Sequence, residues 1–400
     1  MLKASDVMCC MMGHKVRTNV NAQSSAISAL LIALVSISGA TLTACSPSST
    51  PPSTTSQSAS TTASSANGNH ASNTNATPNA SMASTTAAAP NQLTIYTSID
   101  KAALEPLLTS YARQINVPIH IVQDEPMSIL ARLKAEGANS PADVILTEDA
   151  GIFSTAVEEG LLQPFNAEKA VAHVPERYRD PDGNWIALSS YARTAVYDSR
   201  VLHTNDISSY ADLSKLKWSQ KLCLSQGKYI PNQSLVVNLI NNLGDKRTQE
   251  VMQGWLANLS VPVLLDDSEV LKAIESGKCQ IGLVNSNHYG RYLQAHPDTP
   301  IKIKWINKGY GGVSTNITAV AIPHAAKHTE LALGLIEWLA AKDQQSLYAS
   351  LSNTFPIDPN AEASVLLKSW GDIEVSPIPV RFYGERQAMA VDSMQQAGYY

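Results

Sequence analysis

The sequence predicts an α/β protein with two lobes, each a mostly parallel sheet flanked by helices. Segments with strand and helix patterns alternate from residue 93 onward, and such alternation is typical of parallel sheets covered by helices. About 310 residues follow the N-terminal low-complexity region, a length near which a single core stops growing. Hydrophobic residues make up 44% of the chain and charged residues 16%, so the chain has enough apolar surface to form cores.

The first lobe is expected to begin with the strand Leu93–Thr97, whose side chains are mostly apolar or β-branched. The helix Ala102–Gln114 follows, with leucines and Tyr111 on one face. The same patterns predict the strands Pro118–Gln123 and Asp143–Thr147 and the helices Ser128–Glu136 and Ala150–Glu159. The last of these helices is expected to end at Gly160.

The second lobe is expected after the strands Trp185–Leu188 and Thr194–Tyr197. Its predicted strands are Lys221–Leu224 and Gln280–Val284, and its predicted helices are Ser234–Leu243, Arg247–Leu256 and Ser268–Ser276. The strand Thr318–Ile322 and the helix Glu330–Ala341 return to the first lobe. The expected organisation is therefore 92–195 and 316–400 for lobe 1, with C-terminal helices that can pack on both lobes, and 196–315 for lobe 2.

The N-terminus has the anatomy of a secretory signal peptide. Lys15 and Arg17 precede an uncharged apolar run, 26–40, which is too short to span a bilayer. The run is followed by Leu42-Thr-Ala-Cys45, which resembles a lipobox. Residues 1–44 are therefore predicted to be a lipoprotein signal peptide, and Cys45 is predicted to carry the lipid that anchors a periplasmic or other extracytoplasmic protein.

Residues 45–91 are predicted to be a disordered tether. From Ser46 onward Ser, Thr, Ala, Asn and Pro dominate, and the segment has no charged residue. Such a composition cannot bury enough surface to offset the entropy of ordering the chain. A glycosylated stalk is the competing interpretation, with the same mechanical consequence.

Charge and cysteine usage restrict the partners and the compartment. A formal net charge of −5 argues against nucleic acid as a partner and against contact with an anionic membrane other than through the lipid. Apart from Cys45, the mature chain keeps only Cys223 and Cys279. In an oxidising compartment such a pair predicts a disulfide.

Several segments together resemble the ferric-ion-binding periplasmic proteins of ABC importers. The matching segments occur in the family's order and cover essentially the whole chain after the tether: Leu93-Thr-Ile-Tyr-Thr-Ser98, Ala142-Asp-Val-Ile-Leu-Thr-Glu-Asp-Ala-Gly151, Glu158-Glu-Gly-Leu-Leu-Gln-Pro164, Tyr178-Arg-Asp-Pro-Asp-Gly-Asn-Trp185, Asn232-Gln-Ser-Leu235, Gly277-Lys-Cys279 and Asn285 to Gly290.

The resemblance implies the bilobed type II periplasmic binding protein fold, in which two crossover strands form a hinge and the solute lies in the cleft. It implies Fe³⁺ as the transported ligand, with a synergistic anion, and no catalytic cofactor. The implied partners are the permease and ATPase subunits of an ABC importer, and we expect a monomer. The cysteine pair also resembles that of the family's cyanobacterial-type branch, which supports the disulfide.

The residues implied as metal ligands match the family pattern only in part. Asp100 falls at the family's first-loop histidine, Glu148 matches a carboxylate that some members carry, and Tyr229 is the only phenol near a family tyrosine position taken here by Pro231. The family's paired tyrosines align with Asn287 and His288, which leaves Tyr289 as the phenol that follows them. The expected metal ligands are therefore Asp100, Glu148, Tyr229, His288 and Tyr289.

An anion site is expected beside the metal. Asn232, Gln233 and Ser234 precede an apolar helix whose free backbone N–H groups could hold an oxyanion. Arg193 falls where relatives use an arginine for the anion, and Tyr191, which replaces a basic residue, could offer a phenol. Asn287 is expected to bind the ligand through its amide.

Each of these residues also has a structural interpretation. Asp100 could cap the helix that follows it, and Asn232 or Ser234 could cap the next lobe's first helix. Tyr289 could be a packing residue, Glu148 could lie in a solvated loop, and His288 could be a hydrogen-bonded histidine that binds no metal.

The replaced tyrosine pair leaves the ligand open between two alternatives. The first is a rearranged oxygen-rich site for ferric iron or a ferric chelate. The second is the same fold with another solute, either an organic or phosphorylated anion or a softer divalent metal such as zinc at His288. An enzyme is not expected, because no Gly-x-Ser-x-Gly, His-Glu-x-x-His or Gly-rich nucleotide motif is present. A structural or adhesive lipoprotein remains a further alternative.

Overall fold

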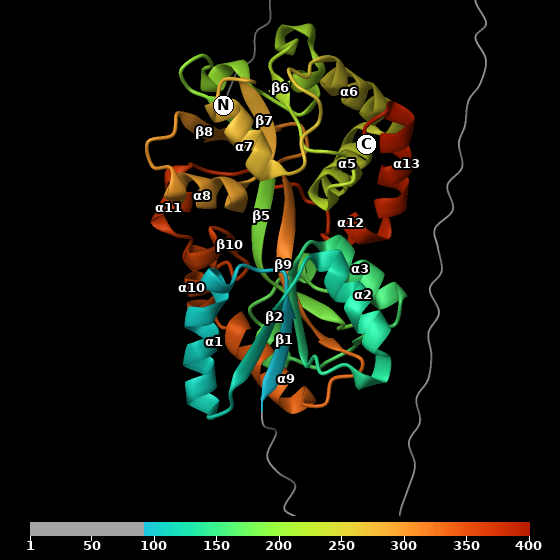
Figure 1. The fold of residues 1–400 in the computed structure, drawn as a ribbon, viewed down its shortest axis with the longest axis vertical. Helices are drawn as coiled ribbons and strands as arrows, with labels where there is room; N and C mark the ends of the chain where they lie inside the picture. The colour runs from blue at the N-terminus through green and yellow to red at the C-terminus, as the bar shows by residue number, and fades with distance from the viewer. Residues whose placement is uncertain (1–91) are drawn as a thin grey trace, which may run out of the picture. The chain divides into compact units, whose positions relative to one another are not determined.

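The described part of the chain has two lobes joined by two long strands. The computed structural model describes residues 92–400, so the predicted signal peptide 1–44, Cys45 and the tether 45–91 lie outside the described residues. The joining strands are β5 (Trp185–Asp198) and β9 (Ser314–Pro323), which run from one lobe into the other (Figure 1). The predicted two-lobed α/β architecture is confirmed. Within 92–400, no helix is long and apolar enough to cross a membrane.

Lobe 1 is built around the parallel strands β2, β1 and β3, with β1 in the middle. All five residues of β1 are buried, as expected for a parallel strand covered on both faces. The helix α1 starts directly after Asp100, which caps it by accepting a hydrogen bond from the Ala102 N–H. The elements are β1 (Leu93–Thr97), α1 (Lys101–Ile115), β2 (Ile119–Gln123), α2 (Pro126–Glu136), β3 (Val144–Glu148), α3 (Ala150–Glu158), β4 (Leu162–Gln163), α4 (Glu168–Val171), α9 (Thr329–Ala340), α10 (Lys342–Ser352) and β10 (Phe355–Pro356).

Lobe 2 is arranged around β7, which pairs with β5 on one side and β6 on the other. Its elements are β6 (Leu222–Cys223), α5 (Ile230–Leu243), α6 (Asp245–Ala257), α7 (Asp267–Glu275), β7 (Ile281–Asn285), α8 (Ser286–Ala295) and β8 (Ile301–Lys304). A disulfide joins Cys223 in β6 to Cys279, just before β7, with 5.9 Å between the two Cα atoms. It therefore ties the end of β6 to the segment that leads into β7.

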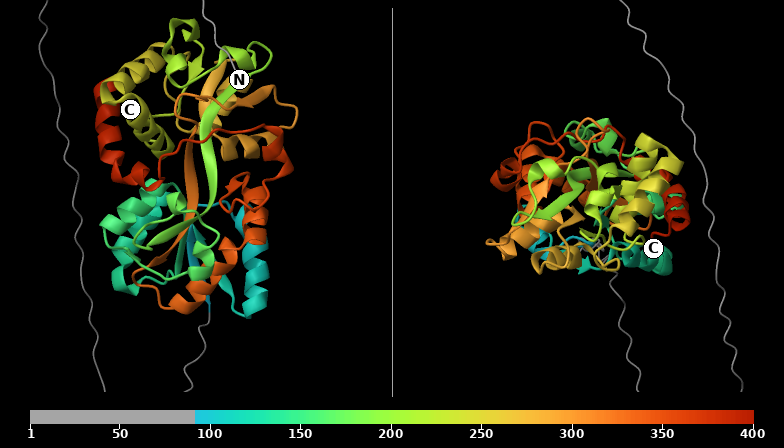
Figure 2. Two further views of the ribbon diagram at one scale, coloured as in Figure 1. Left: turned by 180° about the vertical axis from the view of Figure 1, so that it is seen from behind. Right: turned by 90° about the horizontal axis from the view of Figure 1, so that it is seen from above.

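The connection between the lobes is a hydrogen-bonded antiparallel ribbon. Residues Trp185 to Arg193 of β5 pair with Ala321 to Ser314 of β9, and a register shift between Ala187 and Ser189 interrupts the ladder. Figure 2 shows the two strands crossing between the lobes from behind. The sequence predicted two separate strands here, at Trp185–Leu188 and Thr194–Tyr197. They are one continuous strand, because the serines between them lie in the ribbon that spans the two lobes.

The C-terminal part of the chain contacts both lobes. Its helices are α11 (Val365–Ser369), α12 (Arg381–Glu385) and α13 (Gln387–Ala397). The helix α12 packs against α3 and α5, whereas α13 packs against α5 and α6. In Figure 1 this red segment runs beside the upper lobe and reaches down to α3.

Candidate functional site

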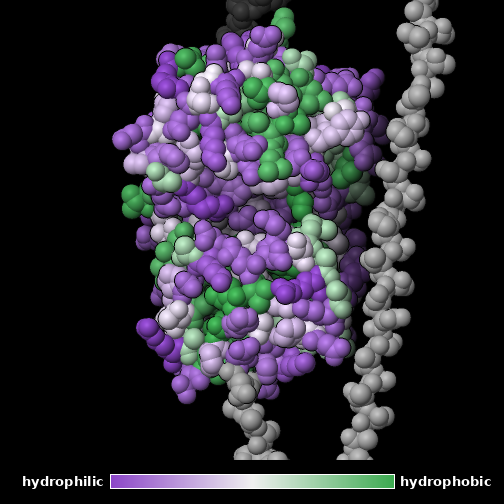
Figure 3. Space-filling view, in the orientation of Figure 1, coloured by the Kyte–Doolittle hydropathy of each residue, from purple (hydrophilic) through white to green (hydrophobic). Residues whose placement is uncertain are grey.

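A cavity of about 920 Å³ lies between the lobes and is lined by both of them. Lobe 1 contributes residues at the C-terminal ends of β1, β2 and β3, where α/β sheets commonly bind ligands. Lobe 2 contributes the segment before α5 and the helices α7 and α8. Hydrophilic residues cover much of the face between the lobes in Figure 3. The cavity is thus positioned by strand ends on one side and helix starts on the other.

Glu148, the last residue of β3, makes the main polar contacts across the cleft. Its Oε1 accepts a hydrogen bond of 3.0 Å from Asn287, and its Oε2 lies 3.9 Å from Nε2 of His288. Both partners are in the first turn of α8. Burial alone would raise the pKa of Glu148, but His288 and the positive charge of Arg291 hold this pKa below its usual value. The carboxylate is therefore charged, and 23% of its side chain remains exposed to the cavity.

His288 lies between two carboxylates, one from each lobe. Its Nδ1 is 3.1 Å from Asp267 and 3.4 Å from the hydroxyl of Tyr229. Burial alone would lower the pKa of His288, but Asp267 and Glu148 raise it above its usual value. Both carboxylates therefore stabilise the protonated form of His288.

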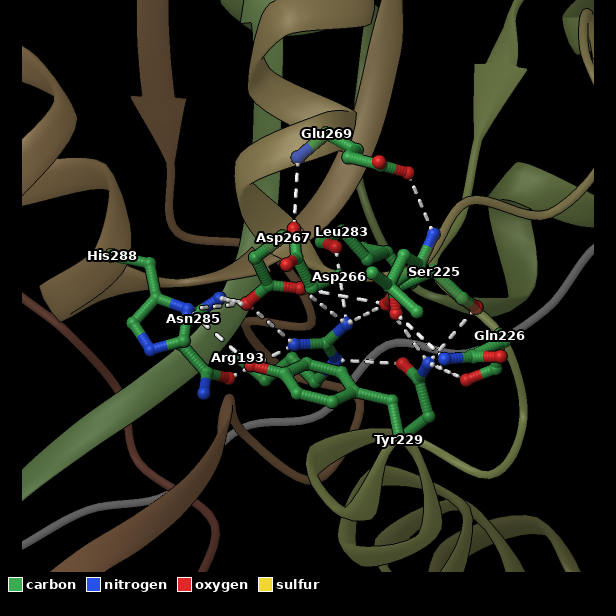
Figure 4. Close-up of polar contacts among 12 residues, drawn as sticks. Arg193, Ser225, Gln226, Tyr229, Asp266, Asp267, Glu269, Leu283, Asn285 and His288 are labelled. Atoms are coloured by element: carbon green, nitrogen blue, oxygen red, sulfur yellow. Dashed lines mark hydrogen bonds and ion pairs between the residues drawn. The ribbon is translucent and has the colours of Figure 1, made fainter. Parts of the chain in front are cut away.

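Arg193 is fully occupied by protein acceptors beside the ring of Tyr229 (Figure 4). Both terminal nitrogens donate to Asp267 at 3.1 Å, and Nε donates to the side-chain oxygen of Asn232 at 2.9 Å. The remaining bonds go to acceptors on neighbouring elements: Ser225 Oγ, the Leu283 carbonyl and Asn285 Oδ1. The guanidinium carbon also lies 5.6 Å from the centre of the Tyr229 ring. Together with His288, Arg193 keeps the pKa of the buried Asp267 well below its usual range.

Asp149 connects three elements at the back of the cavity. Its carboxylate caps α3 at the Gly151 N–H and accepts hydrogen bonds from Ser234 of α5 and Asn316 of β9. Its φ of 79° is unusual for a residue other than glycine. Such backbone angles occur mainly at functional or strongly constrained positions. Burial raises the pKa of Asp149 to about 6, although its three donors oppose the shift.

Tyr191 lies in the middle of β5, opposite Asn316 of β9, and lines the cavity. Only 1% of the residue is exposed, and its hydroxyl has no hydrogen-bond partner within residues 92–400. Buried hydroxyl groups almost always have a partner, so this one requires an explanation. Burial, together with the charges of Asp149 and Glu148, raises its pKa well above the usual value for tyrosine. Tyr191 is therefore a neutral phenol that faces the cavity.

The cleft brings together five of the predicted site residues. They come from five different elements or their ends, and all of them line the cavity: Asp100, Glu148, Tyr191, Tyr229 and His288. Asp100 combines this position with its role as the N-cap of α1.

The prediction that Tyr289 binds the metal is wrong. The residue is 2% exposed, does not line the cavity and donates its hydroxyl to the Ile301 carbonyl at 2.9 Å. Its ring packs near Trp370, with 5.5 Å between the ring centres. The residues Asn287 to Tyr289 form the first turn of a helix, and Tyr289 points into the lobe 2 core.

The predicted anion-binding residues are mostly occupied by internal contacts. The helix α5 begins at Ile230, four residues before the predicted start, because Pro231 fits the first helical turn. Asn232 is therefore inside the helix, where it bonds Arg193 and the carbonyl groups of Ser225 and Gln226. Gln233 accepts from Gln387, and Ser234 donates to Asp149.

Neither Arg193 nor Asn287 lines the cavity. Arg193 donates all its nitrogens to the protein, as described above, and Asn287 lies behind Glu148 with one unpartnered amide oxygen. The expected role of Arg193 and of the Asn232–Ser234 side chains as direct anion ligands therefore disagrees with the structure.

Sequence reasoning missed two carboxylates of the cleft, Asp149 and Asp267. Both line the cavity and both stand at a helix start. The adjacent acidic pairs Glu148-Asp149 and Asp266-Asp267, each before a predicted helix, were the available signals. Within 92–400, no three His, Cys, Asp or Glu side chains form a ready metal site. Any metal held here would need the phenols or an external ligand as additional donors.

Comparison with known proteins places the chain in a family. Residues 106–375 match the family described as bacterial extracellular solute-binding protein. "Iron uptake protein A1" of Synechocystis is 26% identical over 314 residues, which cover 77% of this chain and 87% of that protein. The structure of a Trichodesmium protein "in complex with iron and citrate ligands" is 27% identical, with a TM-score of 0.73, and covers 77% of this chain and all of that one (100%).

A second solved structure gives the same fold. "Ferric iron-Binding Protein A" of Mannheimia haemolytica, in an open conformation, is 26% identical with a TM-score of 0.72, and the match covers 78% of this chain and 99% of that chain. These relatives are named for binding or uptake of a solute. The two-lobed fold is therefore the type II periplasmic binding protein fold, and the chain belongs to the bacterial extracellular solute-binding proteins.

Proposed function

We propose that this protein captures ferric iron, as the ion or as a small chelate, in the interlobe cavity and delivers it to the permease of an ABC importer. The observation that carries the proposal is the cavity between the lobes, which both lobes line with carboxylate and phenol oxygens. The relatives named for iron uptake and ferric iron binding support the same ligand.

The donors available to a hard cation are Glu148, Tyr191, Tyr229 and Asp100, all of which line the cavity. Ferric iron favours anionic oxygen ligands, and a nearby cation would offset the burial that keeps the two phenols protonated. The unpartnered hydroxyl of Tyr191 gains a partner in this arrangement. Asp267 is a poor candidate ligand because Arg193 and His288 already neutralise it.

The size and charge of the cavity favour a chelate over a bare ion. A volume of about 920 Å³ far exceeds that of one metal ion. Lys228, Lys272 and Arg291 also line the cavity, and none of them is in an ion pair within residues 92–400. Their charges suit the carboxylates of an organic anion that brings the metal, and the Trichodesmium relative was solved with iron and citrate. Oxygen atoms of the anion would thus complete the coordination of the iron in place of Tyr289, which the sequence had suggested as a ligand.

We also propose the cellular arrangement that the sequence predicts. The signal peptide 1–44 directs export, lipidated Cys45 anchors the protein, and the tether 45–91 lets a monomeric binding domain reach the permease and ATPase subunits. The lobes are assigned as 92–195 with 316–400 and as 196–315.

The test is titration of the mature protein with ferric citrate, followed by absorbance and calorimetry. We expect stoichiometric binding, a visible tyrosinate-to-iron band and a raised thermal midpoint. Tyr191→Phe and Tyr229→Phe should each weaken the band, whereas Tyr289→Phe, which changes a phenol outside the cavity, should not. Citrate alone, zinc and a sugar phosphate serve as comparison ligands. Tighter binding of one of these, or no ferric binding at all, contradicts the proposal.

A further inference from the structure

The last elements of the chain, residues Arg381 to Tyr399, contact the base of a cavity-lining segment in each lobe. We call residues Arg381 to Tyr399 the C-terminal strap; they comprise α12, α13 and the residues that follow α13. Its helices pack against α3 of lobe 1 and against α5 and α6 of lobe 2. The strap therefore also connects the two lobes, separately from the strands β5 and β9 (Figure 2).

In lobe 1 the strap contacts the helix that follows Asp149. Gly384 lies so close to Ser154 of α3 that any side chain at position 384 would collide with it. One turn before Ser154, a Cβ on Gly151 would be 3.2 Å from Oε1 of Gln387. The first turn of α3, which directly follows Glu148 and Asp149, is thus packed against the strap.

The same Gln387 side chain reaches lobe 2. Its Nε2 donates a hydrogen bond of 2.6 Å to Oε1 of Gln233, in the first half of α5. One residue therefore touches two of the helices whose N-terminal ends border the cavity, α3 and α5. Arg386 adds a hydrogen bond of 3.1 Å to Asn241, further along α5.

In lobe 2 the end of the strap holds the loop that carries Tyr229. The hydroxyl of Tyr399 donates to the Ser225 carbonyl at 2.7 Å, and both residues are buried. Two residues further along the loop, Gly227 lies against the Tyr399 carbonyl, and a Cβ there would collide with it. Glycine is needed at this position because of the close approach, since its φ is not positive.

The Ser225–Tyr229 loop leads straight into the cavity wall. It starts just after β6, and Gln226, Lys228 and Tyr229 all line the cavity. Inside lobe 2 the loop is also held by Arg193, by Asn232 and by hydrogen bonds from Gln226 to the carbonyl groups of Leu264 and Leu265. From the C-terminal strap, the hydrogen bond to the loop is that of Tyr399.

We infer that the C-terminal strap is a positioning device for the binding site, in which Tyr399 fixes the Ser225–Tyr229 loop and thereby the phenol of Tyr229. The link from loop position to ligand affinity rests on the proposed function, whereas the control of the loop by Tyr399 does not. Tyr399 is a positioning residue, because it does not line the cavity.

The experiment compares Tyr399→Phe with Tyr400→Phe in the full mature chain. Tyr400 is the matched control, because it is 70% exposed and its hydroxyl makes only a 3.5 Å contact with the Gln395 carbonyl. Amide hydrogen exchange of the loop is measured without ligand, and ferric citrate affinity is measured by titration. Gly227→Ala is a second variant that disturbs the same contact from the loop side.

We expect Tyr399→Phe to speed exchange in the loop and to weaken ferric citrate binding, each by about twofold to tenfold, as for the loss of one net hydrogen bond. Gly227→Ala should act in the same direction and Tyr400→Phe should do neither. Unchanged loop exchange in Tyr399→Phe overturns the inference, whether or not the protein binds iron. Faster exchange with unchanged affinity overturns the role in binding. Failure of the unaltered protein to bind ferric citrate counts against the proposed function, while the exchange data still decide the role of Tyr399.

Discussion

Replacing Arg193 with methionine should destabilise the protein strongly. Arg193 is 3% exposed and binds both oxygens of Asp267, which is completely buried. Methionine has a similar length but no charge, so Asp267 keeps only His288 as a positive partner. Removing one partner of a buried ion pair typically costs about 3–5 kcal/mol.

The expected fall in the thermal midpoint follows from this cost. Unfolding entropy near 60 °C is about 2.1 cal/mol/K per residue, or about 0.65 kcal/mol/K for roughly 310 residues. A loss of about 4 kcal/mol therefore lowers the midpoint by about 6 °C. Differential scanning calorimetry of the ligand-free protein measures this shift directly.

The matched control is Arg200→Met. Arg200 also pairs with an aspartate, Asp198, at 2.7 Å, but its side chain is 55% exposed. Such exposed pairs are screened by solvent and contribute little, so the midpoint should fall far less than in Arg193→Met. If Arg193→Met left the midpoint unchanged and abolished ferric citrate binding, Arg193 would be a direct ligand, and the reasoning from its internal hydrogen bonds would be refuted.

Three other predictions concern stability and binding. Replacing Cys223 and Cys279 with serine opens a loop closed across a sequence separation of 56, which should cost about 4 kcal/mol in a chemical denaturation experiment. Asp212 is buried and has a lowered pKa because two lysines and an indole N–H outweigh its burial. Its contribution is therefore present above about pH 4 and lost as the pH falls, so Asp212→Asn should be less stable than the unaltered protein at pH 7 by a margin that shrinks toward pH 3. Tyr289→Phe should leave ferric citrate affinity within about twofold, because the lost hydrogen bond lies outside the cavity; a tenfold loss in titration would mean that Tyr289 does reach the metal.

The secondary structure was predictable where local patterns and burial agree. The Val-Ile-Leu run after Asp143 predicted a buried strand at Asp143–Thr147, and β3 occupies Val144–Glu148. The start of α5 was misplaced because Asn232 and Ser234 are common N-cap residues, whereas Pro231 in fact occupies the first turn. A local pattern could not decide between these two starts.

The candidate site was predictable in part. The positions of strand ends indicate which residues lie near the cavity, but they do not indicate which side chains bond to one another. Glu148 ends the strand β3 and Asp100 follows the strand β1 by three residues, and both line the same cavity. The partner of Arg193, by contrast, is Asp267, which is 74 positions away in the sequence. Tyr289 could not be assigned to a side of α8 because that helix itself was not predicted. Long-range packing therefore decides which polar residues remain available to a ligand.

The hydrogen-bonded ribbon of β5 and β9 has a consequence for how the two lobes move. Opening must bend or twist a paired ladder, which resists deformation elastically, unlike a loose peptide linker that permits any orientation. At the register shift between Ala187 and Ser189 the ladder of hydrogen bonds is interrupted, so the ribbon bends most easily there. We therefore expect the two walls of the cavity to keep their alignment when the lobes open. Less rotational entropy is then lost when a bound ligand brings the walls together.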